Sequence, residues 1–228
     1  MRPPQFDSAG AIKRPAAFVL AYRAHISAHG AVANTQITSP VAIPRPPPFT
    51  PARLLRLGAP LDDKRFLFEV KYDGWRAVAH LRPGGCELVS RSGKVYRCFP
   101  KLVRTLASLN RSAVLDGEMA VLDDTGRPDL RSLQQRRGDP VLCVFDCLSL
   151  DGLDLRTLPL VERKRRLKRL VRGHPGILFA GHVERYGTVL FRTVCDQNLE
   201  GIVAKRKDGE YGRDWFKIRN PGYSPLSK

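Results

Sequence analysis

The amino-acid sequence predicts an α+β fold, in which antiparallel strands and helices occupy separate stretches of the 228-residue chain. Three observations lead to this class. Polar and apolar residues alternate in several short segments, which is the period of a half-buried strand. Other segments carry apolar residues at the spacing of a helix face. Glycine and proline turns separate these segments, and 43% of the residues are hydrophobic, enough to form a core.

The first 50 residues are expected to lie outside this fold, as a mobile tail and a proline-rich linker. Asp7 is the only acidic residue before Asp62, and the stretch 39–51 holds six prolines. Prolines at that density favour polyproline II and prevent a helix or a central strand. We therefore expect one folded domain over residues 51–228, with its first element near Leu54.

The first strand of the domain is predicted at residues 66–71. Its aromatic and aliphatic residues alternate with Glu69 and Lys71, so these two charged side chains share the opposite face. The strand ends at the turn Asp73-Gly74. A lysine beside a carboxylate, just before a glycine turn, is either a candidate nucleophile or part of a solvated strand face.

The remaining elements follow the same two periods. Further strands are predicted at residues 77–81, 87–91, 113–122, 141–148, 200–205 and 214–219. Helices are predicted at 99–109, at 160–171 and at 188–198, the last with Thr188 as its cap. Residues 130–138 are ambiguous between a short basic helix and a loop.

The charge of the chain indicates a polyanionic partner. Lys and Arg number 39 against 22 Asp and Glu, a formal net charge of +17, which favours nucleic acid as the partner. The helix at 160–171 carries six cations against one acid, and such a face either contacts phosphates or is simply solvated. The five cysteines have no metal-ligand spacing and indicate a reduced, intracellular protein. No apolar run is long enough to cross a membrane, so we expect a cytoplasmic protein.

Several predicted strands place charged residues opposite their apolar face. Together these residues suit phosphoryl or nucleotidyl transfer, since cations can bind phosphates and acids can hold a divalent metal through oxygen. The set comprises Glu69, Lys71, Arg76, Arg91, Glu118, Glu200, Lys205, Lys217 and Arg219. Lys71 can attack phosphorus once it is neutral. Obtaining that form of a free lysine near pH 7 costs roughly 4 to 5 kcal/mol, and neighbouring cations lower this cost.

Six stretches resemble the motifs of ATP-dependent DNA ligases, in the order of that family and closest to the bacterial end-joining ligases. They are residues 71–76 (KYDGWR), 90–93 (SRSG), 115–118 (LDGE), 144–146 (VFD), 200–205 (EGIVAK) and 215–219 (WFKIR). The resemblance covers about 54–221. It implies the nucleotidyltransferase (adenylation) domain of such ligases, an ATP-grasp-like fold with antiparallel sheets flanking a nucleotide cleft and helices outside.

The resemblance also implies a reaction. Lys71 would attack the α-phosphate of ATP, release pyrophosphate and hold AMP as a phosphoramide. The AMP would pass to the 5′-phosphate of a nick in double-stranded DNA, and the 3′-hydroxyl would displace it. ATP and Mg²⁺ or Mn²⁺ are the implied cofactors, and we expect a cytoplasmic protein that associates with the nucleoid.

Individual roles follow from the same resemblance. Glu69 would accept a hydrogen bond from the adenine amino group, where guanine presents a carbonyl. Phe145 would stack on the base, Lys217 would contact the α-phosphate, and Glu200 and Glu118 would hold the metal. The remaining residues expected to bind the nucleotide, at its ribose or phosphates, are Arg76, Arg91, Glu118, Lys205 and Arg219.

Two features depart from the family. Arg219 stands where lysine is usual, which keeps the charge but changes the donor geometry. The nine residues 220–228 are too few for the oligonucleotide-binding (OB) barrel expected after the last motif. We therefore expect slow adenylylation and weak binding of nicked DNA, with an end-joining or OB-domain protein as a candidate partner. The alternatives are an RNA ligase, a GTP-using capping enzyme, against which Glu69 argues, and a non-catalytic DNA-binding paralogue that assists a ligase.

Overall fold

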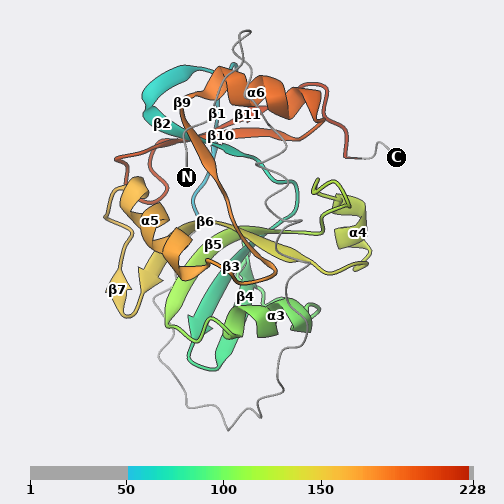
Figure 1. Ribbon diagram of the computed structural model, residues 1–228, viewed down its shortest axis with the longest axis vertical. Helices are drawn as coiled ribbons and strands as arrows, with labels where there is room; N and C mark the ends of the chain where they lie inside the picture. Colours follow the sequence, from blue (N-terminus) through green and yellow to red (C-terminus); the bar gives the residue numbers. More distant parts are fainter. Residues whose placement is uncertain (1–50, 226–228) are drawn as a thin grey trace.

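A computed structural model describes residues 51–225 and contains two β-sheets, with helix α6 on the outer face of one and helix α3 on the outer face of the other (Figure 1). One sheet lies under helix α6 at the top of the view, and the other lies above helix α3 at the bottom. The tail and linker predicted at residues 1–50 lie outside the described residues. Within the described part, no helix is long and apolar enough to span a membrane. The mixed α+β class with antiparallel sheets is confirmed.

The upper sheet has five strands in the order β1-β11-β10-β2-β9. Their bounds are β1 Leu55–Arg56, β2 Asp62–Val70, β9 His182–Tyr186, β10 Gly201–Arg206 and β11 Trp215–Arg219. Strand β2 pairs antiparallel with the central strand β10 and with the edge strand β9, whereas β1 pairs parallel with β11. Helix α6 (Gly187–Asp196) packs against this sheet and closes a core that includes Phe68, Val183 and Ile202.

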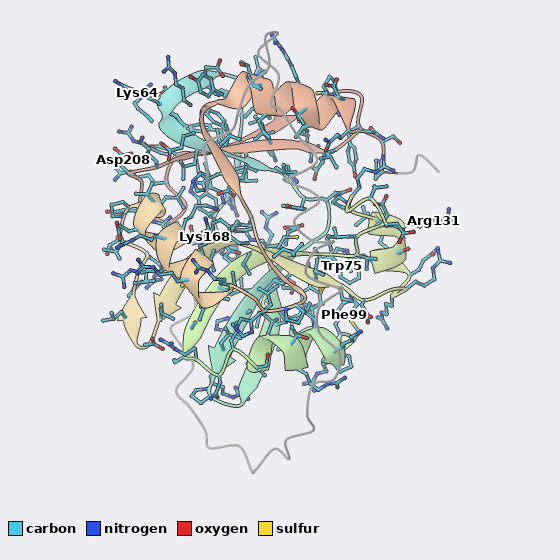
Figure 2. All side chains as sticks on the ribbon, viewed as in Figure 1. Lys64, Trp75, Phe99, Arg131, Lys168 and Asp208 are labelled. Atoms are coloured by element: carbon cyan, nitrogen blue, oxygen red, sulfur yellow. The ribbon has the colours of Figure 1, made fainter. Side chains whose placement is uncertain are left out.

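The lower sheet has the strand order β4-β3-β5-β6-β7, with β8 paired parallel to β6. The bounds are β3 Trp75–Arg82, β4 Gly85–Ser90, β5 Ala113–Ala120, β6 Val141–Leu150, β7 Leu153–Asp154 and β8 Ile177–Phe179. The helices beside it are α3 Pro100–Ala107, α4 Leu130–Gln134 and α5 Leu160–Leu170. Trp75 at the start of β3 packs its ring 6.0 Å from that of Phe99, which precedes α3 (Figure 2). A second and larger apolar core lies here.

Periodicity predicts most of these elements correctly. In β2, Phe66, Phe68 and Val70 all face the upper core, as alternation requires. The apolar stretch of β6 lies inside its sheet, as predicted for a central strand. Pro100 occupies the first turn of α3, where a backbone N–H would have no partner within the helix, so proline loses no hydrogen bond there. The ambiguous stretch after residue 129 forms the short helix α4.

Two expectations are wrong. Thr188 does not cap α6, because Tyr186 holds the cap position and Thr188 lies inside the helix. The backbone N–H and the hydroxyl of Thr188 instead donate to the Asp62 carboxylate at 2.9 and 2.8 Å. The cations of α5 also do not form one outer face, since Arg163 and Lys164 are buried. Arg163 forms an ion pair with Asp146 of β6 at 2.8 Å.

Gly187 allows α6 to pack closely on β2, which gives a test of this core. A Cβ at this position would lie 2.4 Å from both the Leu61 carbonyl oxygen and a ring carbon of Phe68. Overpacking of this kind costs about 2 kcal/mol, so Gly187→Ala should lower the free energy of unfolding by that amount in urea denaturation. Gly58→Ala is the matched control, because nothing lies within 4 Å of its Cβ. The control should change stability by less than about 1 kcal/mol, and equal effects of the two substitutions would contradict this packing.

Candidate active site

Lys71 lies directly after β2, with its ammonium against a carboxylate from the far end of the chain. Its Nζ is 2.5 Å from Oε2 of Glu200, and its backbone N–H donates to the Gly201 carbonyl at 2.9 Å. The pairing of β2 with β10, in which Val70 faces Ile202, brings the two residues together. Gly201 has φ +151°, and a Cβ there would lie 2.2 Å from the Ile218 carbonyl oxygen. Only glycine fits where β10 begins against β11.

Glu200 and the turn after Lys71 are held by further contacts from the C-terminal segment. A guanidinium nitrogen of Arg219 lies 3.8 Å from Oε1 of Glu200, so both carboxylate oxygens face cations. The hydroxyl of Tyr223 donates to Asp73 at 2.7 Å. Lys71 therefore projects from a turn that is anchored on both sides.

Glu69 is the most enclosed acid of the predicted set, with 3% of its surface exposed. Its Oε1 accepts from Nζ of Lys164 at 2.6 Å, and its Oε2 accepts from Nζ of Lys205 at 2.7 Å. Burial alone would raise the pKa of Glu69, but the two ammonium groups outweigh burial and lower it. Burial lowers the pKa of Lys205, against the effect of Glu69. The carboxylate is thus ionised between two cations.

Phe145 of β6 lies beside this cluster, with cations over its ring. The ammonium of Lys205 is 4.2 Å from the ring centroid, and the guanidinium of Arg76 is 4.7 Å from it. Lys205 also lies 4.1 Å from the centroid of the Trp215 ring. Cation–π attraction stabilises this arrangement. The Phe145 ring is thus flanked by cations from β3 and β10.

Arg76 of β3 forms a two-pronged ion pair with Asp116 of β5, with both N···O distances 2.6 Å. The Tyr211 hydroxyl donates to the same carboxylate at 2.6 Å. Burial alone would lower the pKa of Arg76, but Asp116 outweighs burial and raises it. Glu118 faces Arg76 across the β3–β5 pair. Burial raises the pKa of Glu118 to about 7; Lys71 and Arg76 oppose this rise, whereas Glu200 and Asp116 add to it.

The structure thus gathers most of the predicted residues into two adjoining groups. Lys71, Glu200 and Arg219 form one, and Glu118 is electrostatically coupled to it. The other consists of Glu69, Lys205, Phe145 and Arg76. Within the described residues, Arg91 and Lys217 form no ion pair. Arg91 is exposed just after β4, next to Ser90, which pairs with Ala77, and Lys217 lies on β11 opposite Val203.

Glu118 and Glu200 are the carboxylates available for a divalent metal. No group of three or more His, Cys, Asp or Glu side chains suited to a metal occurs in residues 51–225. The raised pKa of Glu118 reflects burial near other acids, a strain that a cation would relieve. The two carboxylates therefore fit a metal that takes its other oxygen ligands from phosphate and water.

Sequence reasoning missed several residues that build this site. The sequence predicts Lys164 on a basic helix face, whereas in the structure it lies on the buried stripe of Leu160 and Leu167. Tyr211 and Tyr223 lie in segments with no pattern that could have revealed their hydrogen bonds to Asp116 and Asp73. Their roles depend on long-range contacts, which local periodicity does not encode.

Comparisons with known proteins add independent observations. The sequence model of a family described as ATP dependent DNA ligase domain matches residues 59–219. The multifunctional non-homologous end joining protein LigD of Pseudomonas aeruginosa is 34% identical over 165 residues, which cover 67% of this chain and 20% of LigD. The SPbeta prophage-derived DNA ligase-like protein LigB of Bacillus subtilis is 29% identical over 189 residues, which cover 78% of this chain and 69% of LigB. The chain thus spans about a fifth of that LigD.

Solved structures share the fold. The ligase domain of Mycobacterium tuberculosis LigD aligns with a TM-score of 0.64 and 29% identity, over 74% of this chain and 59% of that one. A mycobacterial DNA ligase D complexed with ATP and MES aligns with a TM-score of 0.63 and 28% identity, over 74% of this chain and 60% of that one. The two sheets are therefore arranged as in ligase domains.

Glu118 gives this site a measurable pH dependence. Its pKa rises from 4.5 to about 7 on folding, so in that window the folded state holds a proton that the unfolded chain releases. The free energy of unfolding should therefore fall as pH rises through the window, by about 3 kcal/mol from this group. Urea denaturation at pH 5 and pH 7.5 should show this fall in the wild type and lose it in Glu118→Gln. Glu210→Gln, at an exposed position, should retain the fall. The same pH dependence in wild type and Glu118→Gln would contradict the assignment.

Proposed function

The chain belongs to the ATP-dependent DNA ligase domain family, whose model matches residues 59–219, and from this premise we propose that it transfers AMP from ATP to DNA through Lys71. The adenylation domain would comprise residues 51–228, with residues 1–50 as its tail and linker. The observation that carries the proposal is the position of Lys71, held by Glu200 at 2.5 Å beside a cluster of cations.

The first step would form an N–P bond between Nζ of Lys71 and the α-phosphorus of ATP. The bond from that phosphorus to the bridging oxygen would break, and pyrophosphate would leave with the electron pair. Since the ammonium of Lys71 is bound to Glu200, its proton must leave before attack. Arg219, which lies 3.8 Å from Glu200, and Lys217 of β11 would bind the negative charge of the phosphate under attack.

Adenine would lie between Glu69 and Phe145. The carboxylate of Glu69 is ionised, so it can accept from the exocyclic amino group and would repel the carbonyl of guanine. Phe145 would stack on the base after Lys205 or Arg76 moves from its ring. Arg76, Arg91 and Glu118 would then contact the ribose or the phosphates.

A divalent cation, Mg²⁺ or Mn²⁺, would be held by Glu118 and Glu200 and would supply neutralisation of charge on the triphosphate. Its ligands are the carboxylates whose mutual repulsion contributes to the raised pKa of Glu118. Movement of Glu200 away from Lys71 would also release Nζ of Lys71 from its ion pair.

Nicked double-stranded DNA is the proposed acceptor of AMP, and the net charge of +17 supports binding of such a polyanion. The 5′-phosphate at the nick would take AMP from Lys71, and the 3′-hydroxyl would displace it. The names of relatives such as LigD refer to end joining. We therefore include an end-joining or OB-domain protein as a proposed partner.

Labelling with ATP that carries the label on its α-phosphate tests the first step. With magnesium present, the wild type should form an acid-labile protein adenylate, and Lys71→Ala should reduce its yield at least about 100-fold, because no other amine occupies that position. Lys64→Ala is the matched control, since Lys64 is an exposed lysine of the same strand (Figure 2). Equal labelling of wild type and Lys71→Ala, or no labelling of either, would refute the proposal.

Sealing of a pre-adenylylated nick tests the last step and separates an enzyme from an accessory DNA-binding protein. This step does not use the lysine as a nucleophile, so Lys71→Ala should still seal at a measurable rate while failing to seal an ordinary nick in the presence of ATP. The measurement is ligated product on a denaturing gel, with and without an end-joining partner. Binding of the nick without sealing by either protein would favour the accessory function.

A further inference from the structure

Lys164 of α5 has contacts that no role described above explains. Its side chain is 1% exposed, and its Nζ lies 2.6 Å from Oε1 of Glu69. The same ammonium donates to the Ala180 carbonyl at 2.9 Å and to the Phe145 carbonyl at 3.4 Å. It also lies 4.7 Å from the centroid of the Phe179 ring. Every N–H of this buried ammonium therefore has an acceptor.

These contacts join the two sheets at the proposed base site. Glu69 belongs to β2 of the five-stranded sheet, whereas Phe145 belongs to β6 of the six-stranded sheet. Lys164 comes from a helix that packs on β6. One ammonium thus fixes both the carboxylate proposed to contact the edge of the base and the backbone of the residue proposed to stack on it.

The other partner of Glu69 is not equivalent to Lys164. Lys205 lies on β10, in the same sheet as Glu69, and its ammonium covers the Phe145 ring at 4.2 Å. A base that stacks on that face takes the place of the Lys205 ammonium. Lys164 touches the backbone carbonyl of Phe145 rather than its ring, so it can stay when a nucleotide binds.

We propose that Lys164 is the positioning residue for base selection, because it holds Oε1 of Glu69 and leaves Oε2 to accept from the amino group of adenine. The proposal rests on the proposed adenylylation. Without Lys164, a base that displaced Lys205 would leave Glu69 as a buried carboxyl without a cation, and burial favours the neutral acid. A neutral carboxyl can donate as well as accept, so it would also bind a 6-oxo base.

Three triphosphates that differ at position 6 of the purine test this role. ATP carries an amino group there, inosine triphosphate carries a carbonyl, and purine riboside triphosphate carries hydrogen. The ratio of kcat/KM for adenylylation with ATP to that with inosine triphosphate should fall about tenfold or more in Lys164→Met, chiefly through the KM for ATP. The value for purine riboside triphosphate should change less than about threefold, since that base offers Glu69 no amino group.

Lys168→Met is the matched control. Lys168 is an exposed lysine one turn along the same helix (Figure 2), and its ammonium lies 5.9 Å from the centroid of the same Phe179 ring. This control should keep the wild-type ratio. A ratio within about twofold of wild type in folded Lys164→Met would overturn the proposal, as would an equal fall with all three triphosphates, which indicates general damage.

A second variant, Lys164→Arg, keeps the test decisive if Lys164→Met does not fold. Lys164→Arg keeps the charge but changes the donor geometry, so its ATP to inosine triphosphate ratio should lie between those of wild type and Lys164→Met. If Lys164→Met does not fold, a fall of about threefold in Lys164→Arg supports the proposal and an unchanged ratio overturns it. If the wild type forms no adenylate, the proposed function fails. In that case the affinities of wild type and variants for the same triphosphates, measured by calorimetry, test the role of Lys164. The ratio of the affinity for ATP to that for inosine triphosphate replaces the ratio of kcat/KM values.

Discussion

The burial of Glu69 between Lys164 and Lys205 is the constraint on which the arrangement of the site depends. A carboxylate that is 3% exposed loses its hydration, and this penalty is several kcal/mol for an ion in a protein interior. The two ion pairs, at 2.6 and 2.7 Å, offset the penalty only when both lysines are in position. Because removal of one partner from a buried pair typically costs about 3 to 5 kcal/mol, Glu69 stabilises the fold only after β10 and α5 have docked.

The same docking fixes the position of Lys71. In the β2–β10 register, Lys205 lies opposite Leu67. Val70, three residues later on β2, lies opposite Ile202. A slip of one residue would turn every side chain of the strand to the other face, so the register that pairs Lys205 with Glu69 also determines where β2 ends. Lys71 then follows β2 next to Glu200, which precedes β10. Burial of one acid thus helps to place the lysine proposed as the nucleophile.

The sequence could predict the elements whose own residues repeat a period, but not the contacts between them. Alternation located β2 and β5, and helical spacing located α3 and α5. The short strands β8 and β9 were not predicted, since they are defined by pairing with β6 and β2 rather than by their own pattern. The motifs identified residues of the candidate site, whose roles stay predictions. Lys164 did carry a signal, because it lies four residues after Leu160 and three before Leu167, on the buried face of α5.

The contacts between the two sheets explain why polar residues matter so much here. Each sheet has its own apolar core, one around Phe68 and the other around Leu115. Directional contacts connect the sheets near the site: the Lys164–Glu69 ion pair, and the hydrogen bond from Tyr211, in the loop between β10 and β11, to Asp116 of β5. Apolar packing tolerates small shifts between surfaces, whereas a buried ion pair weakens as soon as its geometry is lost. The separation of Glu69, the proposed acceptor of the base edge, from Phe145, the proposed stacking ring, therefore depends on a few charged atoms. Changes at these atoms should therefore alter both the stability of the domain and the proposed selection of the base.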